Sequence, residues 1–148
     1  MYQIVGQTVI FNWDFNQVLN DAILNDIKSC NKIIFSNYGD LDTCLITDNE
    51  YDCEYYNRRK LSKFNHPLDN LPSEIGDLTL SYHFNQCLDN LPNNITKITF
   101  KSYEDYNIRF NQEIKKIPPN LKIIDISRIE NKSHLKKEFK KFNIEIIE

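Results

Sequence analysis

The residues best suited to chemistry in this 148-residue sequence are acidic side chains that follow one another closely. They are Asp40, Asp42, Asp48, Glu50, Asp52 and Glu54. Carboxylate oxygens grouped in this way could hold a divalent cation. The run lacks the spacing of a calcium-binding loop, and a basic segment, RRKLSK at residues 58–63, follows it directly. We therefore expect solvated or ion-paired carboxylates in residues 40–54, and we predict no bound metal.

Cysteine and histidine offer the next candidates for a metal centre or a nucleophile. They are scattered singly along the chain, as Cys30, Cys44, Cys53, Cys87, His66, His83 and His134. A zinc site needs about four converging ligands and usually shows paired spacing, which is absent here. No nucleophile is spaced with His83 or His134, and no glycine loop could cradle phosphate. We predict reduced thiols, no cofactor and no enzymatic activity.

The composition argues against two classes of partner. The net charge is −3 with 26% charged residues, whereas a dedicated nucleic-acid binder is usually strongly basic. No apolar run approaches the roughly 18–20 residues that a membrane span needs. The segment MYQIVGQTVIFNWDF has no basic region followed by an apolar one, so it does not resemble a signal peptide. We expect a cytoplasmic protein that binds neither nucleic acid nor membrane.

Two nearly identical segments of the sequence indicate the structural elements that would hold any functional side chain in place. FNHPLDNLPSEIGDLTL begins at Phe64, and FNQCLDNLPNNITKITF begins at Phe84. Both end in the apolar spacing L-x-x-L-x-L, which is typical of leucine-rich repeats. The same spacing returns at Leu121, Ile124 and Ile126, and FNQVLNDAI, from Phe15, is a weaker copy of the first half.

The repeat period predicts strands near residues 9–11, 33–35, 78–80, 98–100, 124–126 and 144–146. The interval between Phe35 and Leu80 spans about two periods, so one strand is missing from this series. CEYYN, residues 53–57, lies near its midpoint and is rich in β-formers, while TCLIT, residues 43–47, is the alternative. The predicted fold is a leucine-rich-repeat-like solenoid of about seven short parallel strands in one curved sheet, with irregular return segments.

We expect a single repeat domain over residues 1–148, with different structures at its two ends. In residues 1–14 we expect an N-terminal cap, formed by a hairpin that turns at Gly6 and Gln7. Residues 15–126 should form the stacked coils. Residues 127–148 should form a C-terminal cap, in which a helix from Ser133 to Phe142 is followed by a closing strand. Ser133 is the predicted N-cap of this helix.

The Phe-Asn pairs predict two ladders along the stack. The rings of Phe15, Phe64, Phe84 and Phe110 should point inward and stack on their copies in neighbouring coils. The side chains of Asn16, Asn65, Asn85 and Asn111 should bond buried backbone groups at the bend. Neither ladder implies catalysis.

The outward positions of the strands are the predicted contact surface. They are Lys32, Ile34 and Ser36; Asp77, Thr79 and Ser81; Lys97, Thr99 and Lys101; and Ile123, Asp125 and Ser127. Stacked coils align such positions on one exposed sheet face, which suits protein recognition or is plainly solvated. Two further contact regions contain aromatic residues: Tyr55 and Tyr56 in one, and Tyr103, Tyr106 and Arg109 in the other.

The chain resembles the FNIP repeat family, a relative of leucine-rich repeats that is abundant in social amoebae and giant DNA viruses of amoebae. The resemblance is clearest at Phe64-Asn65-His66-Pro67, and it continues at Phe84-Asn85-Gln86-Cys87, where Cys87 replaces the family proline. It weakens at Phe110-Asn111 and Phe15-Asn16. It implies a binding scaffold without catalytic residues, located in the host cytoplasm if the protein is viral.

FNIP proteins often carry an F-box before the repeats, which makes them substrate receptors of a ubiquitin ligase. Here the repeats begin near Val9, so an F-box would have to come from another chain. We predict a non-enzymatic scaffold that binds a protein partner through the strand face and the loop insertions. The alternative is a substrate-recognition subunit of a ubiquitin ligase. Self-association through an end strand is a further prediction.

Overall fold

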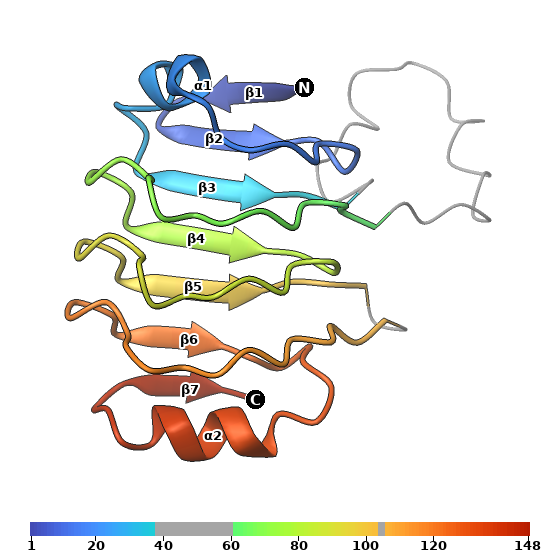
Figure 1. The fold of residues 1–148 in the computed structure, drawn as a ribbon, viewed down its shortest axis with the longest axis vertical. Helices are drawn as coiled ribbons and strands as arrows, with labels where there is room; N and C mark the ends of the chain where they lie inside the picture. Colours follow the sequence, from blue (N-terminus) through green and yellow to red (C-terminus); the bar gives the residue numbers. More distant parts are fainter. Residues whose placement is uncertain (38–60, 104–105) are drawn as a thin grey trace.

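The computed structural model describes residues 1–37, 61–103 and 106–148. Its strands form one seven-stranded sheet in which neighbours in the sequence are neighbours in space (Figure 1). In chain order the elements are β1 (Tyr2–Val5), β2 (Thr8–Phe11), α1 (Asp21–Asp26), β3 (Lys32–Phe35), β4 (Asp77–Leu80), β5 (Lys97–Phe100), β6 (Ile123–Asp125), α2 (Ser133–Phe139) and β7 (Glu145–Ile147).

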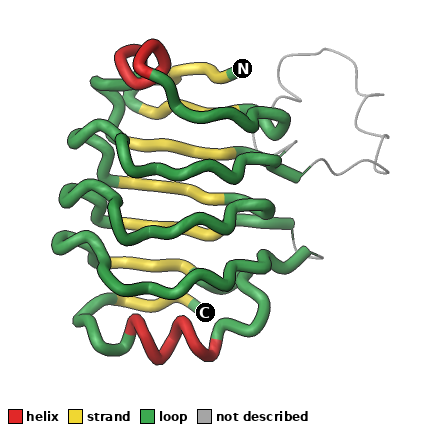
Figure 2. The backbone as a smooth tube through the Cα atoms, viewed as in Figure 1, coloured by secondary structure: helices red, strands yellow, loops and turns green. Residues whose placement is uncertain are grey.

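The strands from β2 to β7 are parallel, and the described segments between them return along one side of the sheet (Figure 2). This arrangement is a solenoid of about five turns, which confirms the predicted leucine-rich-repeat-like fold. The repeated corners are built alike, since the carbonyls of Pro72, Pro92 and Pro118 each accept a hydrogen bond from the residue three positions later.

The prediction of an additional strand between β3 and β4 is wrong. These two strands pair directly, with Ile33 opposite Leu78, so the sheet has no place for another strand between them. Both candidates, residues 53–57 and 43–47, lie outside the described residues. The described sheet nevertheless has seven strands, because β1 of the N-terminal hairpin pairs antiparallel with β2. The sequence period could not reveal the direct pairing of β3 with β4, because Phe35 and Leu80 are about two periods apart although their strands are neighbours in the sheet.

The N-terminal cap is the predicted hairpin. Gly6 has a φ of +59°, the left-handed conformation that a tight hairpin turn requires and that glycine adopts without strain. The helix α1 follows in the first return segment and was not predicted, because FNQVLNDAI was interpreted as irregular repeat. Asn20 caps this helix by accepting a hydrogen bond from the Ile23 N–H at 3.1 Å.

The C-terminal cap is the predicted helix followed by a strand. Leu135 and Phe139 on α2 are each 1% exposed, so the helix closes the end of the apolar column. The predicted N-cap, Ser133, is instead the first helical residue. Lys132 precedes it with helical φ and ψ of −66° and −2° and makes no side-chain cap bond. The chain turns into the helix at Asn131, whose φ is +54°.

The core is a file of aliphatic side chains in register across the parallel strands. Pairing aligns Val9, Ile33, Leu78, Ile98 and Ile124, and each is at most 1% exposed. A second file places Phe11 beside Phe35 at a ring distance of 5.0 Å. Each coil thus covers apolar side chains of its neighbour that would otherwise be exposed to solvent, as a stacked repeat requires.

The phenylalanine stack is present as predicted. Ring centroids lie 5.9 Å apart from Phe15 to Phe64, 6.2 Å from Phe64 to Phe84 and 6.4 Å from Phe84 to Phe110. Because Phe64 stacks directly on Phe15, the chain between β3 and residue 64 leaves the stack uninterrupted. Residue 64 therefore restores the repeat after the insertion.

The asparagine ladder is also present, although on the surface rather than around buried groups. The side-chain oxygens of Asn16, Asn65 and Asn85 accept the backbone N–H of the next asparagine at 3.3, 2.9 and 3.0 Å. Asn85 Nδ2 also donates to Asn111 Oδ1 at 2.9 Å. The ladder therefore aligns adjacent coils outside the core.

Candidate protein-interaction surface

The outward sides of the strands form two rows of side chains in register, which we call the strand face. The first row contains Thr8, Lys32, Asp77, Lys97, Ile123 and Glu145, and the second contains Ile10, Ile34, Thr79, Thr99, Asp125 and Ile147. The structure therefore brings together eight of the twelve predicted outward positions on one side of the sheet. The alternation of strand side chains had predicted this arrangement.

The centre of the strand face is charged. Lys32 Nζ lies 3.1 Å from Asp77 Oδ2, and the two side chains are 36% and 27% exposed. Lys97 follows Asp77 in the same row. Asp77 Oδ1 is buried and has no hydrogen-bond partner among the described residues. Buried carboxylate oxygens are normally hydrogen-bonded, so Asp77 Oδ1 is an exception within this row.

Exposure differs along the second row. Thr79 is only 7% exposed, because its short side chain lies between the neighbouring residues Ile34 and Thr99. Thr99 and Asp125 are half-buried. Asp125 Oδ1 accepts the Ser127 N–H at 3.0 Å, so part of this carboxylate already serves a turn. Thr79 thus contributes less surface than its outward position predicts.

Ser36 and Ser81 do not belong to the exposed face on which they were predicted. They are 3% and 2% exposed. Each hydroxyl donates to a carbonyl of the preceding coil, Ser36 to Phe11 and Ser81 to Phe35. Both residues follow the last residue of a strand, where the strict alternation ends. Lys101, at the equivalent position after β5, is exposed, and its N–H donates to the Leu80 carbonyl at 2.8 Å.

Three tyrosines form a cluster beyond the ends of β4 and β5. The rings of Tyr82 and Tyr103 each meet Tyr106 edge-on, with centroid distances of 6.0 and 6.4 Å. Tyr106 is 37% exposed. Sequence reasoning identified Tyr103 and Tyr106 but missed Tyr82. Its position two residues after a repeat strand was the available signal, because the segment that follows β5 leaves the stack at the same edge.

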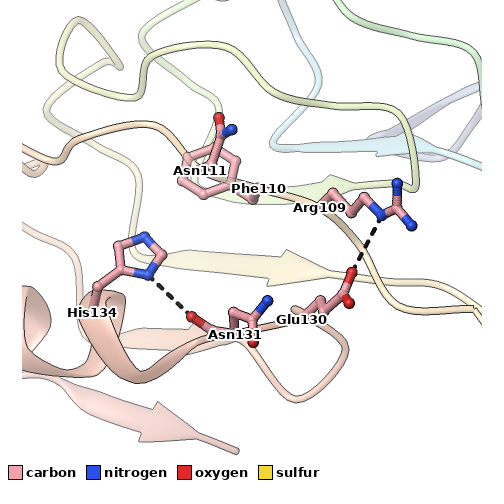
Figure 3. Close-up of a pocket in the computed structure, with 6 residues that line it drawn as sticks. All are labelled: Arg109, Phe110, Asn111, Glu130, Asn131 and His134. Atoms are coloured by element: carbon pink, nitrogen blue, oxygen red, sulfur yellow. Dashed lines mark hydrogen bonds and ion pairs between the residues drawn. The ribbon is translucent and has the colours of Figure 1, made fainter.

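Arg109 borders a shallow pocket near the C-terminal cap. Its Nε lies 3.3 Å from Glu130 Oε2, and the pocket of about 330 Å³ is lined by Arg109, Phe110, Asn111, Glu130, Asn131 and His134 (Figure 3). His134 Nδ1 lies 3.1 Å from the Asn131 carbonyl oxygen. The ring of Phe110 is 2% exposed and the arginine is paired within the chain. The pocket therefore combines a surface ion pair with the end of the asparagine ladder.

The remaining predicted site residues are isolated or outside the described residues. Tyr55, Tyr56 and the acidic segment 40–54 lie outside them. Among the residues that are described, His, Cys, Asp and Glu form no group of three that could hold a metal ion. Within the same parts of the chain, no helix is long and apolar enough to cross a bilayer.

The two described cysteines are free thiols in different settings. Cys30 is buried, which raises the pKa of its thiol. Cys87 is exposed, and the Asp89 N–H favours its thiolate. Partial burial and the nearby carboxylates of Asp89 and Asp69 outweigh that bond and raise the pKa of Cys87. Neither environment activates a nucleophile.

A comparison with protein families agrees with this repeat geometry. The FNIP Repeat model matches residues 64–103. The FNIP match begins at the first residue of the Phe64-Asn65 pair and spans β4 and β5, and it confirms the resemblance found in the sequence. Phe15-Asn16 and Phe110-Asn111 lie outside the FNIP match but occupy equivalent rungs of both ladders. Comparison with curated proteins and with solved structures gave no significant match.

Proposed function

We propose that this FNIP-repeat protein is a non-enzymatic scaffold that binds a protein partner through the strand face and the tyrosine cluster. The main support for this proposal is the register of the parallel strands. It places Lys32, Asp77 and Lys97 side by side in one solvent-facing row. Fixed side chains on a rigid sheet lose little conformational freedom on binding, which favours affinity.

The chemistry of the surface favours a protein partner. The strand face combines opposite charges with the half-buried side chains of Ile34 and Ile123, and the tyrosine cluster lies beyond the ends of β4 and β5. Tyrosine is a frequent anchor of protein interfaces because its ring is large, rigid and partly polar.

A pull-down from cytosol, followed by mass spectrometry, tests this proposal. Wild-type protein is compared with Lys97→Glu, which reverses one charge on the strand face, and with Tyr106→Ala in the tyrosine cluster. Lys116→Glu is the matched control, because Lys116 is exposed on a return segment. We expect both surface variants, but not the control, to lose the specifically captured protein. Equal capture by all four proteins would contradict the proposal.

The narrower proposal is a substrate-recognition subunit of a cytoplasmic ubiquitin ligase, with the F-box on another chain. Its support is the FNIP match at residues 64–103 together with the F-box that often accompanies such repeats. Capture of a ligase subunit by wild-type protein is the expected result under this alternative. A captured set that contains a specific partner but no ligase subunit would leave the general scaffold and remove the ligase role.

A further inference from the structure

The two end strands of the sheet differ in how they meet solvent. At the C-terminal end, β7 carries Glu145 and is flanked by Glu148, which pairs with Lys136 of the covering helix. Charges and helices at a sheet edge discourage pairing with other chains. At the N-terminal end, β1 has no charged side chain and no proline, and Ile4 and Val5 are 44% and 61% exposed.

The backbone of β1 also has a defined outward register. The Asn12 N–H donates to the Met1 carbonyl at 3.1 Å, so Met1 and Asn12 form a hydrogen-bonded pair. Hydrogen-bonded pairs alternate along antiparallel strands, and they recur here at Gln3 with Ile10 and at Val5 with Thr8. The N–H and C=O groups of Tyr2 and Ile4 therefore point away from β2, toward the open edge.

These outward groups are complementary to a second copy of themselves. If two β1 strands run antiparallel about a twofold axis at Gln3, Tyr2 of each copy lies opposite Ile4 of the other. Each such pair can exchange both backbone hydrogen bonds. The side chains also favour this pairing, because pairs of an aromatic and a β-branched residue stabilise antiparallel strands. No charged side chain on β1 would repel its copy.

The inner side of the edge is already fixed in place. The Tyr2 ring lies 5.3 Å from the Phe11 ring, and its hydroxyl donates to Asp26 of α1 at 2.6 Å. Ile4 lies opposite Val9 and continues the aliphatic file of the core, yet it remains 44% exposed because the described file ends there. A second copy would continue the file without rearranging the cap.

We propose that the protein forms a symmetric homodimer through antiparallel pairing of β1 with β1 of a second copy. This joins two solenoids into one continuous sheet and leaves both strand faces free, so it is independent of the proposed partner site. A four-residue edge buries little area, so we expect a weak dimer that forms with increasing concentration.

Sedimentation velocity over a range of protein concentrations tests the dimer. Ile4→Pro removes an outward N–H and leaves the β1–β2 hydrogen bonds intact, and edge strands tolerate proline at such a position. We expect it to lower the association constant by about tenfold or more, with an unchanged circular dichroism spectrum. Ile147→Lys on β7 is the control and should associate like wild type. A monomeric wild type, or loss of association only in Ile147→Lys, would overturn the proposal.

A disulfide trap tests the register separately from the affinity. The variants are made with Cys44, Cys53 and Cys87 replaced by serine. Gln3→Cys places two thiols on the axis, in a non-hydrogen-bonded pair about 4.5 Å apart between Cα atoms, which a disulfide can span. Val5→Cys places them roughly 13 Å apart, too far to bridge. We expect a reducible dimer from Gln3→Cys alone. Equal cross-linking of both variants, or of neither, would overturn the register.

Discussion

Phe84 occupies the middle of the phenylalanine stack and is the residue that tests it most directly. Its ring is 1% exposed and lies between Phe64 and Phe110. Phe84→Ala should lower the free energy of unfolding by about 3–5 kcal/mol, because it removes buried area and leaves a cavity in a closely packed column. Urea denaturation measures the loss. Phe84→Leu retains much of the volume and should cost clearly less, and equal losses would contradict stacking as the cause.

Asp89 links two coils through its carboxylate and predicts a dependence on pH. Its Oδ1 accepts the N–H groups of Lys115 and Lys116 at 3.0 and 3.1 Å. Burial opposes ionisation, but hydrogen bonds from the Cys87 thiol and these N–H groups, with the Lys115 charge, hold the pKa of Asp89 below its usual value. The resulting stabilisation is therefore present above the unfolded-state pKa and is lost as pH falls through the folded-state pKa.

Urea midpoints measured from about pH 5 to about pH 3 test this dependence, because an unfolded aspartate titrates near 3.9. Wild type should lose more stability over this range than Asp89→Asn, which cannot ionise at that position. Parallel curves for the two proteins would show that Asp89 does not contribute through its charge.

The roles of the Phe-Asn pairs could be predicted from their repetition alone. A residue that recurs at one position of every coil must meet its copies, so the inward ring and the ladder of asparagines followed from the spacing. The spacing did not reveal that the asparagine ladder lies on the surface rather than around buried groups. The sequence did not reveal that Ser36 and Ser81 turn inward. That outcome depends on where the strand ends, and the ends of short strands are set by hydrogen bonds that hydrophobic periodicity does not encode.

At the scale of elements, α1 is short and depends on its cap. A helix of this length is marginal in isolation, and Asn20 satisfies one of its unpaired N–H groups. Asn20→Ala should destabilise the protein by about 0.5–2 kcal/mol, measured by urea denaturation. Asn25→Ala, the same substitution within the helix, should be nearly neutral because alanine favours helices. A larger loss for Asn25→Ala would contradict the capping role.

The strands were the most predictable elements, and the reason is physical. Stacking demands an apolar side chain at the same positions of every coil, so L-x-x-L-x-L recurs wherever a strand lies. The predicted strand between β3 and β4 is absent from the sheet because these two strands pair directly, so the period could not be extended from Phe35 to Leu80. Its favoured location, residues 53–57, lies outside the described residues. The helix α1 was missed for a related reason, since its apolar residues, such as Ile23, also satisfy the repeat pattern of the return segment.

At the scale of the molecule, the C-terminal cap should determine how readily the solenoid aggregates. Leu135→Ala combined with Phe139→Ala removes two buried anchors of α2 and exposes the end of the aliphatic file. We expect a loss of at least about 3 kcal/mol and aggregation on mild heating, measured by circular dichroism and light scattering. Lys137→Ala, on the exposed side of the same helix, is the control. An unaggregated double variant with unchanged thermal stability would contradict the capping role.

The candidate surface was less predictable than the fold because it depends on side chains that stacking does not constrain. The alternation of the strands placed Lys32, Asp77 and Lys97 in one row. It could not reveal the close approach of Lys32 to Asp77 or the low exposure of Thr79, which depend on neighbouring side chains. The contact between Tyr82 and Tyr106 depends on where the insertion after β5 returns.

The insertion between β3 and β4 leaves and re-enters the solenoid through a narrow neck. The Ser62 N–H donates to Asn37 Oδ1 at 2.8 Å, and both residues are 1% exposed. Closing a loop becomes only slowly less favourable as its length grows. We therefore expect the stacked repeats to tolerate a segment of another length between Asn37 and Ser62, as long as this hydrogen bond is kept.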